Sequence, residues 1–250
     1  MKFVRFTRGE KAVCGVVENE EVIELRGDIF GRYRRTSQRH HLSDLRILPP
    51  CSPSKIMAIG LNYADHAAEG NQPLPKNPVL FLKAPSSLIA HNEPIVLTDN
   101  TSRIDHEAEL AVIIKDRIKN ISSEEAINHI LGYTCSNDVS HRPFQRSDGQ
   151  WCRAKSFDTF CPLGPHIVTD IDPRDLKIEC RVNGEVRQSS RTSKLLFDVP
   201  YLVSFLSQGM TLLPGDVIMT GTPAGVGPLK EGDVVEVVIE GVGTLRNPVT

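Results

Sequence analysis

The sequence has no apolar stretch long enough to cross a membrane and no marked excess of charge of either sign. No run approaches the roughly 20 apolar residues that a transmembrane helix needs. The first residues also lack the apolar segment of a signal peptide. The formal net charge is -2 at pH 7, so the chain offers no basic surface of the kind that nucleic acid requires. We therefore expect a globular, cytoplasmic protein that binds neither membranes nor nucleic acid.

Cysteines are few, and their spacing is not that of a metal or redox motif. None of the six belongs to a Cys-x-x-Cys pair or to a Cys/His cluster with zinc-site spacing. We expect reduced thiols with structural roles. Cys152 and Cys161 lie in a segment that also carries candidate functional residues, so a redox role for these two stays open.

The strand pattern predicts a mainly β protein with a few helices. Residues 2–7, 12–17 and 21–25 read as a small meander. A basic, polar segment at 32–41 and a proline-rich joint at 48–53 follow it, which indicates a domain boundary. We predict a small N-terminal β domain over residues 1–52 and a larger domain over residues 53–250.

Short strands dominate the rest of the chain, and two helices interrupt them. Strands are expected at 55–60, 79–83, 95–97, 107–114, 178–182, 185–188, 216–220, 233–239 and 244–249. Asn183-Gly184 predicts a type I′ hairpin turn, because both turn positions need positive φ. A capping box at Ser122 predicts a helix that ends at Gly132, and a second helix is expected to follow Asp198 and end at Gly209.

Two glutamates, Glu107 and Glu109, stand at the head of an apolar, β-branched run. In a strand their side chains point to the same face as Ala111 and Ile113. Two carboxylates on a face that continues into apolar core need a positive partner between them. With Asp138 as a third carboxylate, the oxygen donors favour a hard divalent cation over zinc. The same pattern is also typical of the solvated face of an antiparallel sheet.

Residue 60 is a glycine that ends a predicted strand, and His66 and Glu69 follow it at a spacing of three. If this segment coils, both side chains lie on one face, where the carboxylate would fix the imidazole tautomer and raise its basicity. Such a dyad is a competent general base, although ordinary surface pairs have the same spacing. The loop at 70–75 has the composition of a mobile lid.

Polar and cationic residues and a glycine-rich turn lie further along the chain. Arg142, Arg153 and Lys155 either balance the charge of the carboxylates or bind an anionic substrate, and Gln145 follows Asp138 at seven residues. The turn at 220–227 lacks the Gly-Lys-Ser/Thr ending of a phosphate loop, and no helix follows it as a dinucleotide fingerprint requires. It is either a tight connection or a donor of N–H groups and the Thr222 hydroxyl to a substrate carboxylate.

Six motifs, taken in order, resemble the fumarylacetoacetate hydrolase family from about residue 55 to the C-terminus. They are Gly60-x-Asn62-Tyr63-x-x-His66-x-x-Glu69, Val79-Leu80-Phe81-Leu82-Lys83, His106-Glu107-x-Glu109-Leu110, Asn137-Asp138-Val139-Ser140, Ala154-Lys155-Ser156-Phe157-Asp158 and Thr220-Gly221-Thr222-Pro223-x-Gly225-Val226-Gly227. The short N-terminal domain also looks like one found in many members. The resemblance implies a mixed β-sandwich or roll around the active site, in a homodimer with a Mg²⁺ or Mn²⁺ ion per subunit.

The resemblance also implies roles for individual residues. The metal ligands would be Glu107, Glu109 and Asp138. A lid dyad of His66 and Glu69 would act on water or a proton. Substrate contacts would come from Arg142, Gln145, Lys155 and Thr222, with Lys83 at the strand end beside the site. Asp105 shares the strand parity of the two glutamates but is not a ligand in the family pattern.

The chemistry of these residues leads to one main hypothesis and two alternatives. A small anionic 2-oxo acid can chelate the cation, which then stabilises the enolate formed when a neighbouring bond breaks. Our leading interpretation is a divalent-metal-dependent hydrolase that cleaves a C–C bond in acylpyruvate-like 2-oxo acids. The alternative is an isomerase or decarboxylase of 2-hydroxyhepta-2,4-diene-1,7-dioate-like or oxaloacetate-like substrates. The third hypothesis, a non-catalytic metal- or ligand-binding relative, leaves the dyad of His66 and Glu69 without a task.

Overall fold

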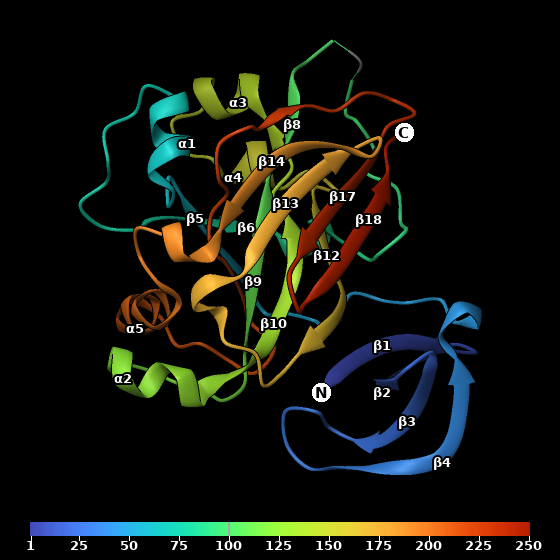
Figure 1. The fold of residues 1–250 in the computed structure, drawn as a ribbon. Helices are drawn as coiled ribbons and strands as arrows, with labels where there is room; N and C mark the ends of the chain where they lie inside the picture. Colours follow the sequence, from blue (N-terminus) through green and yellow to red (C-terminus); the bar gives the residue numbers. More distant parts are fainter. Residues whose placement is uncertain (100) are drawn as a thin grey trace.

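The computed structural model describes residues 1–99 and 101–250 and confirms the mainly β fold class (Figure 1). The strands are β1 Lys2–Arg8, β2 Lys11–Glu18, β3 Glu21–Gly27, β4 Tyr33–His41, β5 Ile56–Gly60, β6 Val79–Lys83, β7 Leu88–Ile89, β8 Ile104–His106, β9 Ala108–Ile114, β10 Ile130–Asn137, β11 Ser140–His141, β12 Cys161–Val168, β13 Lys177–Val182, β14 Glu185–Arg191, β15 Val217–Met219, β16 Gly227–Pro228, β17 Val234–Ile239 and β18 Gly243–Pro248. The helices are α1 Ala64–Glu69, α2 Ser123–Ala126, α3 Arg142–Ser147, α4 Cys152–Lys155 and α5 Val199–Gly209.

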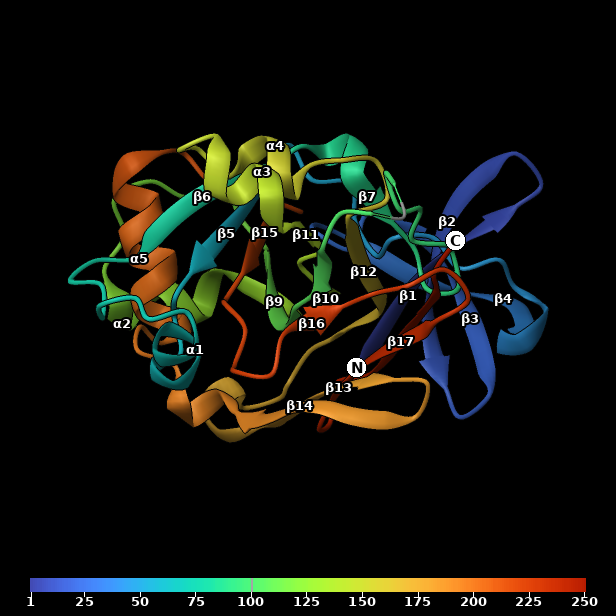
Figure 2. The same ribbon diagram turned by 90° about the horizontal axis from the view of Figure 1, so that it is seen from above.

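One large sheet runs through the molecule in the order β4-β3-β2-β1-β12-β10-β9-β15-β5-β6, with β7 paired to β12. The N-terminal meander joins this sheet because β1 pairs antiparallel with β12. In Figures 1 and 2 the meander lies at the end opposite α1, α2 and α5. The domain limit between residues 52 and 53 stays a prediction.

The basic segment at 32–41, where we predicted no strand, forms the edge strand β4. Its side chains are mostly exposed, and Arg39 pairs with Glu21 of the neighbouring strand at 2.9 Å. A strand at the edge of a sheet needs no apolar face to hold it, and charged residues there prevent pairing with other chains. The sequence therefore did not predict this strand, because its apolar and polar residues do not alternate.

A smaller sheet in the order β14-β13-β17-β18 packs across one face of the large sheet. Leu110 and Val112 of β9 belong to the core on that side, whereas Ala111 and Ile113 belong to the core on the other side. The predicted alternation of this strand is therefore confirmed. The predicted hairpin turn is also confirmed, with φ of 54° at Asn183 and 81° at Gly184.

The helix predicted after Ser122 is shorter than expected. Its capping box is present, with Ser122 Oγ accepting from the backbone N–H of Glu125 at 3.3 Å. The helical segment ends at His129, however, and β10 begins at Ile130, so the predicted end at Gly132 is wrong. Gly132 pairs with Ile113 of β9, and a Cβ there would lie 2.4 Å from the carbonyl oxygen of Val168. Sheet pairing has overridden the helical pattern.

Two further expectations concern the second helix and the strand at 95–97. The second helix is confirmed as α5, with Asp198 accepting from the backbone N–H of Tyr201 at 2.9 Å. The prediction of a strand at 95–97 is wrong, because this segment forms an isolated bridge between Ile95 and Val249, with backbone hydrogen bonds to residues 248 and 250, and no strand. No disulfide links the six cysteines, of which Cys152 is exposed and Cys161 buried. Within the described part of the chain, no helix has the length and apolarity needed to cross a membrane.

Candidate active site

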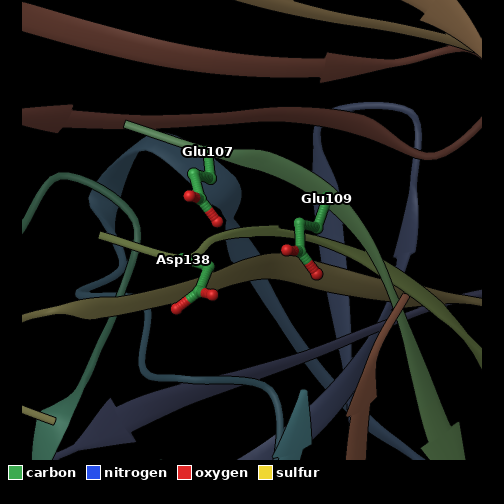
Figure 3. A group of neighbouring side chains, drawn as sticks. All are labelled: Glu107, Glu109 and Asp138. Atoms are coloured by element: carbon green, nitrogen blue, oxygen red, sulfur yellow. The ribbon is translucent and has the colours of Figure 1, made fainter. Parts of the chain in front are cut away.

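Three carboxylates meet where β9 and β10 run side by side. Glu107 directly precedes β9, Glu109 lies in β9, and Asp138 directly follows β10. The backbone N–H of Asp138 donates to the carbonyl of Glu107 at 2.9 Å, which fixes the register of the two segments. One carboxylate oxygen from each residue lies within 4.8 Å of the others (Figure 3). All three side chains are buried, so the solvated strand face is the wrong interpretation.

Buried cations neutralise two of these carboxylates. Lys155 Nζ lies 2.8 Å from Glu107 Oε2 and 2.6 Å from Asp138 Oδ2. Lys83 Nζ lies 2.5 Å from Asp138 Oδ1, and Arg142 Nη2 lies 2.6 Å from Glu107 Oε1. Burial alone would raise the pKa of Glu107, but the charges of Lys155 and Arg142 outweigh it and lower that pKa. Glu107 is therefore held as a carboxylate.

Glu109 differs, because no ion pair reaches it from the described residues. Its Oε2 accepts a hydrogen bond of 2.8 Å from the backbone N–H of Gly221. Burial, together with the negative charges of Asp138 and Glu107, raises its pKa well above the ordinary 4.5. A cation among the three carboxylates would remove this cost, and oxygen donors suit a hard divalent ion. The residues therefore fit a divalent metal site and do not distinguish Mg²⁺ from Mn²⁺.

A pocket of about 690 Å³ opens onto the carboxylates. It is lined by every residue that the sequence singled out for the site except Lys83, namely His66, Glu69, Glu107, Glu109, Asp138, Arg142, Gln145, Lys155 and Thr222. Lys83 is fully buried behind Asp138 and also donates to the carbonyl of Lys155. It therefore supports the carboxylates from behind and does not face the pocket.

The predicted dyad lies on α1, at one wall of the pocket. His66 Nδ1 lies 3.3 Å from Glu69 Oε2, as the helical spacing predicted. The Glu69 carboxylate also accepts from the backbone N–H of Gly225 at 3.1 Å, which ties the helix to the turn at 220–227. The His66 side chain is 15% exposed and that of Glu69 39%, so the imidazole is the more enclosed member.

The glycine-rich turn is a tight connection whose polar groups bind other parts of the chain. Gly221 and Gly225 have φ of 100° and 97°, and a Cβ on Gly225 would lie 2.2 Å from the carbonyl oxygen of Arg187. Thr222 Oγ1 donates to the carbonyl of Ala108 at 2.8 Å. The structural interpretation of the turn is therefore confirmed, and a substrate contact from Thr222 stays a prediction.

Two buried residues that we did not assign hold the site together. Asp105 accepts from Arg142 Nε at 2.7 Å and from Arg103 Nε at 2.8 Å. Gln188, on β14, accepts from the backbone N–H of Ala108 at 3.0 Å. The shared strand parity with the glutamates could have identified Asp105, whereas Gln188 has no local sequence signal.

Comparisons with known proteins identify the family to which the chain belongs. The protein family described as fumarylacetoacetate (FAA) hydrolase C-terminal matches residues 55–250. The family described as Rv2993c-like, N-terminal matches residues 1–50. A mitochondrial oxaloacetate tautomerase of Xenopus laevis is 45% identical over 228 residues, which cover 85% of this chain and 72% of that protein.

Two solved structures are also similar along the whole chain. A 2-hydroxyhepta-2,4-diene-1,7-dioate isomerase from Mycobacterium marinum is 44% identical with a TM-score of 0.93, covering 100% of this chain and 98% of its own. A fumarylacetoacetate hydrolase from Exiguobacterium antarcticum is 38% identical with a TM-score of 0.87, covering 100% and 99%. The chain belongs to the fumarylacetoacetate hydrolase family of enzymes.

Proposed function

We propose that the protein is a divalent-metal-dependent isomerase of 2-oxo acids, which interconverts keto and enol forms by moving a proton. The observation that carries this proposal is the His66–Glu69 dyad, held on α1 in the same pocket as the three carboxylates. The tautomerase and isomerase relatives, at 45% and 44% identity, support this outcome over C–C cleavage. Our leading interpretation from the sequence, a hydrolase, thus becomes the second candidate.

The carboxylates and cations of the pocket have separate tasks in this proposal. Glu107, Glu109 and Asp138 would hold the divalent ion, which would supply positive charge to stabilise an enolate. The Arg142 guanidinium is held by Asp105 and Glu107, so it is oriented before the substrate arrives. Its terminal nitrogens already contact Gln145 and Glu107, so the remaining N–H donors of the guanidinium would bind the substrate carboxylate.

The dyad moves the proton. With Nδ1 of His66 facing the Glu69 carboxylate, Nε2 is the nitrogen that can accept a proton from the substrate carbon. Glu69 stabilises the imidazolium that forms, and Nε2 then returns the proton to the other end of the enolate. The Gly225 N–H holds Glu69 in place during this exchange.

The test is the rate at which the ultraviolet absorbance of the oxaloacetate enol decays, with added Mg²⁺ or Mn²⁺. We expect the wild-type protein to accelerate ketonisation. The rate with His66→Ala should be lower by at least about 100-fold, which is the lower end of the rate enhancement that a general base provides. Metal-independent ketonisation, or an unchanged rate in His66→Ala, would refute the proposal.

Hydrolysis is the second candidate, because the same dyad could deliver water to a more distant carbonyl. The similarity to the Exiguobacterium antarcticum hydrolase favours it specifically. Acetylpyruvate and fumarylpyruvate would report this activity through the release of pyruvate. Turnover of either compound at a rate above that of oxaloacetate ketonisation would make the protein a hydrolase.

A further inference from the structure

Seven charged side chains form one chain of contacts from the buried carboxylates to the mouth of the pocket. Cations and carboxylates alternate in the order Lys83, Asp138, Lys155, Glu107, Arg142, Asp105 and Arg103. Every contact between neighbours is 2.8 Å or shorter. The side chain of Lys83, at the inner end, is 0% exposed, whereas that of Arg103, at the outer end, is 53% exposed.

Arg103 is anchored and still has donors to offer. Its Nε donates to both oxygens of Asp105, at 2.8 and 3.1 Å. Its two terminal amino groups form no hydrogen bond with the described residues, and the side chain lines the pocket. A guanidinium that is already oriented loses little freedom when it binds a carboxylate, and two parallel N–H donors match that group.

We propose that Arg103 binds a second carboxylate of the substrate, so that the protein selects 2-oxo dicarboxylates over 2-oxo monocarboxylates. This inference rests on the proposed function, because it assumes that the 2-oxo acid end lies at Glu107, Glu109 and Asp138. A substrate held there would extend past the buried Asp105 toward the mouth, where Glu69, whose side chain is 39% exposed, contributes negative charge. The second carboxylate of the substrate would be repelled there if it had no cationic partner, and the Arg103 guanidinium offsets this repulsion.

Arg146 is the competing cation on the same pocket wall. It forms no ion pair or hydrogen bond with residues 1–99 or 101–250, so nothing fixes its direction. An unrestrained side chain must be ordered by the ligand, and that cost weakens its discrimination between ligands. The structure therefore favours Arg103 as the residue that selects the substrate.

The test compares ligands of equal length that differ only in the terminal group. The Mn²⁺-loaded protein is titrated calorimetrically with 2-oxoglutarate and 2-oxopentanoate, and with 2-oxoadipate and 2-oxohexanoate. In at least one pair we expect the wild-type protein to bind the diacid at least tenfold more tightly. Arg103→Gln should abolish this preference while monoacid affinity stays within twofold. Arg103→Lys should retain part of it, because the charge remains.

Control variants make the result decisive. Arg103→Gln leaves the Arg142 bond to Asp105 intact, so the fold should persist. Arg153→Gln removes an exposed arginine paired with Asp148 outside the pocket, and it should leave both affinities unchanged. Equal weakening of diacid and monoacid in Arg103→Gln, or loss of the preference in Arg146→Gln instead, would overturn the assignment.

The outcome also separates this inference from the function on which it rests. A diacid preference that disappears in Arg103→Gln, in a protein that does not accelerate oxaloacetate ketonisation, supports the inference and refutes the isomerase. Ketonisation without any diacid preference refutes the inference and supports the isomerase. Binding of neither class of acid by the wild-type protein would overturn both.

Discussion

The buried ammonium of Lys155 donates a hydrogen bond of 2.6 Å to the carboxylate of Asp138. The same nitrogen lies 2.8 Å from Glu107, so one cation joins two of the three carboxylates. Burial alone would lower the pKa of Lys155, but Asp138 and Glu107 outweigh it and raise that pKa. Lys155 therefore remains charged and has a structural task besides any contact with substrate.

Replacement of Lys155 by methionine should destabilise the fold. The loss of one partner from a buried ion pair leaves an uncompensated charge and costs about 3–5 kcal/mol. We expect a loss in this range in urea denaturation of the metal-free protein. Lys115→Met is the control, because Lys115 pairs with Asp116 at 3.9 Å in an exposed position, where pairs contribute about 0–1 kcal/mol. An equal loss in both variants would contradict the structural role of Lys155.

Replacement of Glu109 by glutamine should lower Mn²⁺ affinity by tenfold or more, about 1.4 kcal/mol. Glutamine keeps an acceptor for the Gly221 N–H but removes the charge that a cation would neutralise. Isothermal titration calorimetry measures the effect, with Glu10→Gln on an exposed turn as the control. Equal affinity in the Glu109 variant would show that this residue is not a ligand.

The stability of the metal-free protein should also depend on pH through Glu109. Because its folded-state pKa is raised above the ordinary 4.5, the folded protein holds this proton more tightly than the unfolded chain. The resulting stability is fully present below the ordinary pKa of the unfolded chain and is lost as the pH rises from there through the raised pKa of the folded protein.

The Glu109→Gln variant isolates this effect. Glutamine does not titrate, so the unfolding free energy of the variant minus that of the wild type should become more positive as the pH rises above the ordinary pKa of 4.5. Urea denaturation in the presence of a chelator measures the difference at each pH. A difference that is constant, or that falls with pH, would mean that Glu109 is not protonated in the folded protein.

The His66→Ala variant should separate catalysis from metal binding. Because His66 contacts Glu69 and is not among the three carboxylates, we expect Mn²⁺ affinity within twofold of wild type. Ketonisation should fall by at least 100-fold. His129→Ala, which removes a histidine paired with Asp116 on the surface, should change neither quantity. A parallel loss of metal affinity in His66→Ala would place His66 among the ligands.

Local patterns predicted those parts of the fold that local physics determines. The hairpin at Asn183-Gly184 and the capping box at Ser122 were found because each motif satisfies its own hydrogen bonds or φ angles within a few residues. The end of the helix after Ser122 was not found, because pairing of β10 with β9 decides it. The exposed edge strand β4 could not be predicted, because a strand without a buried face shows no alternation of apolar and polar residues.

The site shows the same division between local and distant information. Glu107 and Glu109 could be identified because they lie two residues apart in one strand, and His66 and Glu69 because they share a helical face. The task of Lys83 could not be read from the sequence, because it depends on packing against Asp138, 55 residues away. The sequence gives Asp105 no role although it shares the strand parity of the two glutamates, because its partners Arg103 and Arg142 are defined only by the fold.

The last prediction concerns Gln188, because its side chain links β14 to Ala108 of β9 and to the turn at 220–227. The residue is 1% exposed. It accepts from the Ala108 N–H at 3.0 Å and donates to Thr222 Oγ1 at 2.8 Å and to the Pro223 carbonyl at 2.7 Å. Leucine at this position would leave the Ala108 N–H without its partner between the two glutamates, and an unpaired buried polar group costs about 1–3 kcal/mol.

We therefore expect Gln188→Leu to lower the free energy of unfolding by about 2 kcal/mol or more and to weaken Mn²⁺ binding. Denaturation and calorimetry measure the two effects. Gln38→Leu on the exposed edge strand makes the same chemical change where no buried group depends on it, and should alter stability by less than about 0.5 kcal/mol. If Gln188→Leu loses stability but keeps full Mn²⁺ affinity, the register of β9 does not depend on this side chain, and the backbone pairing with β10 alone positions the ligands.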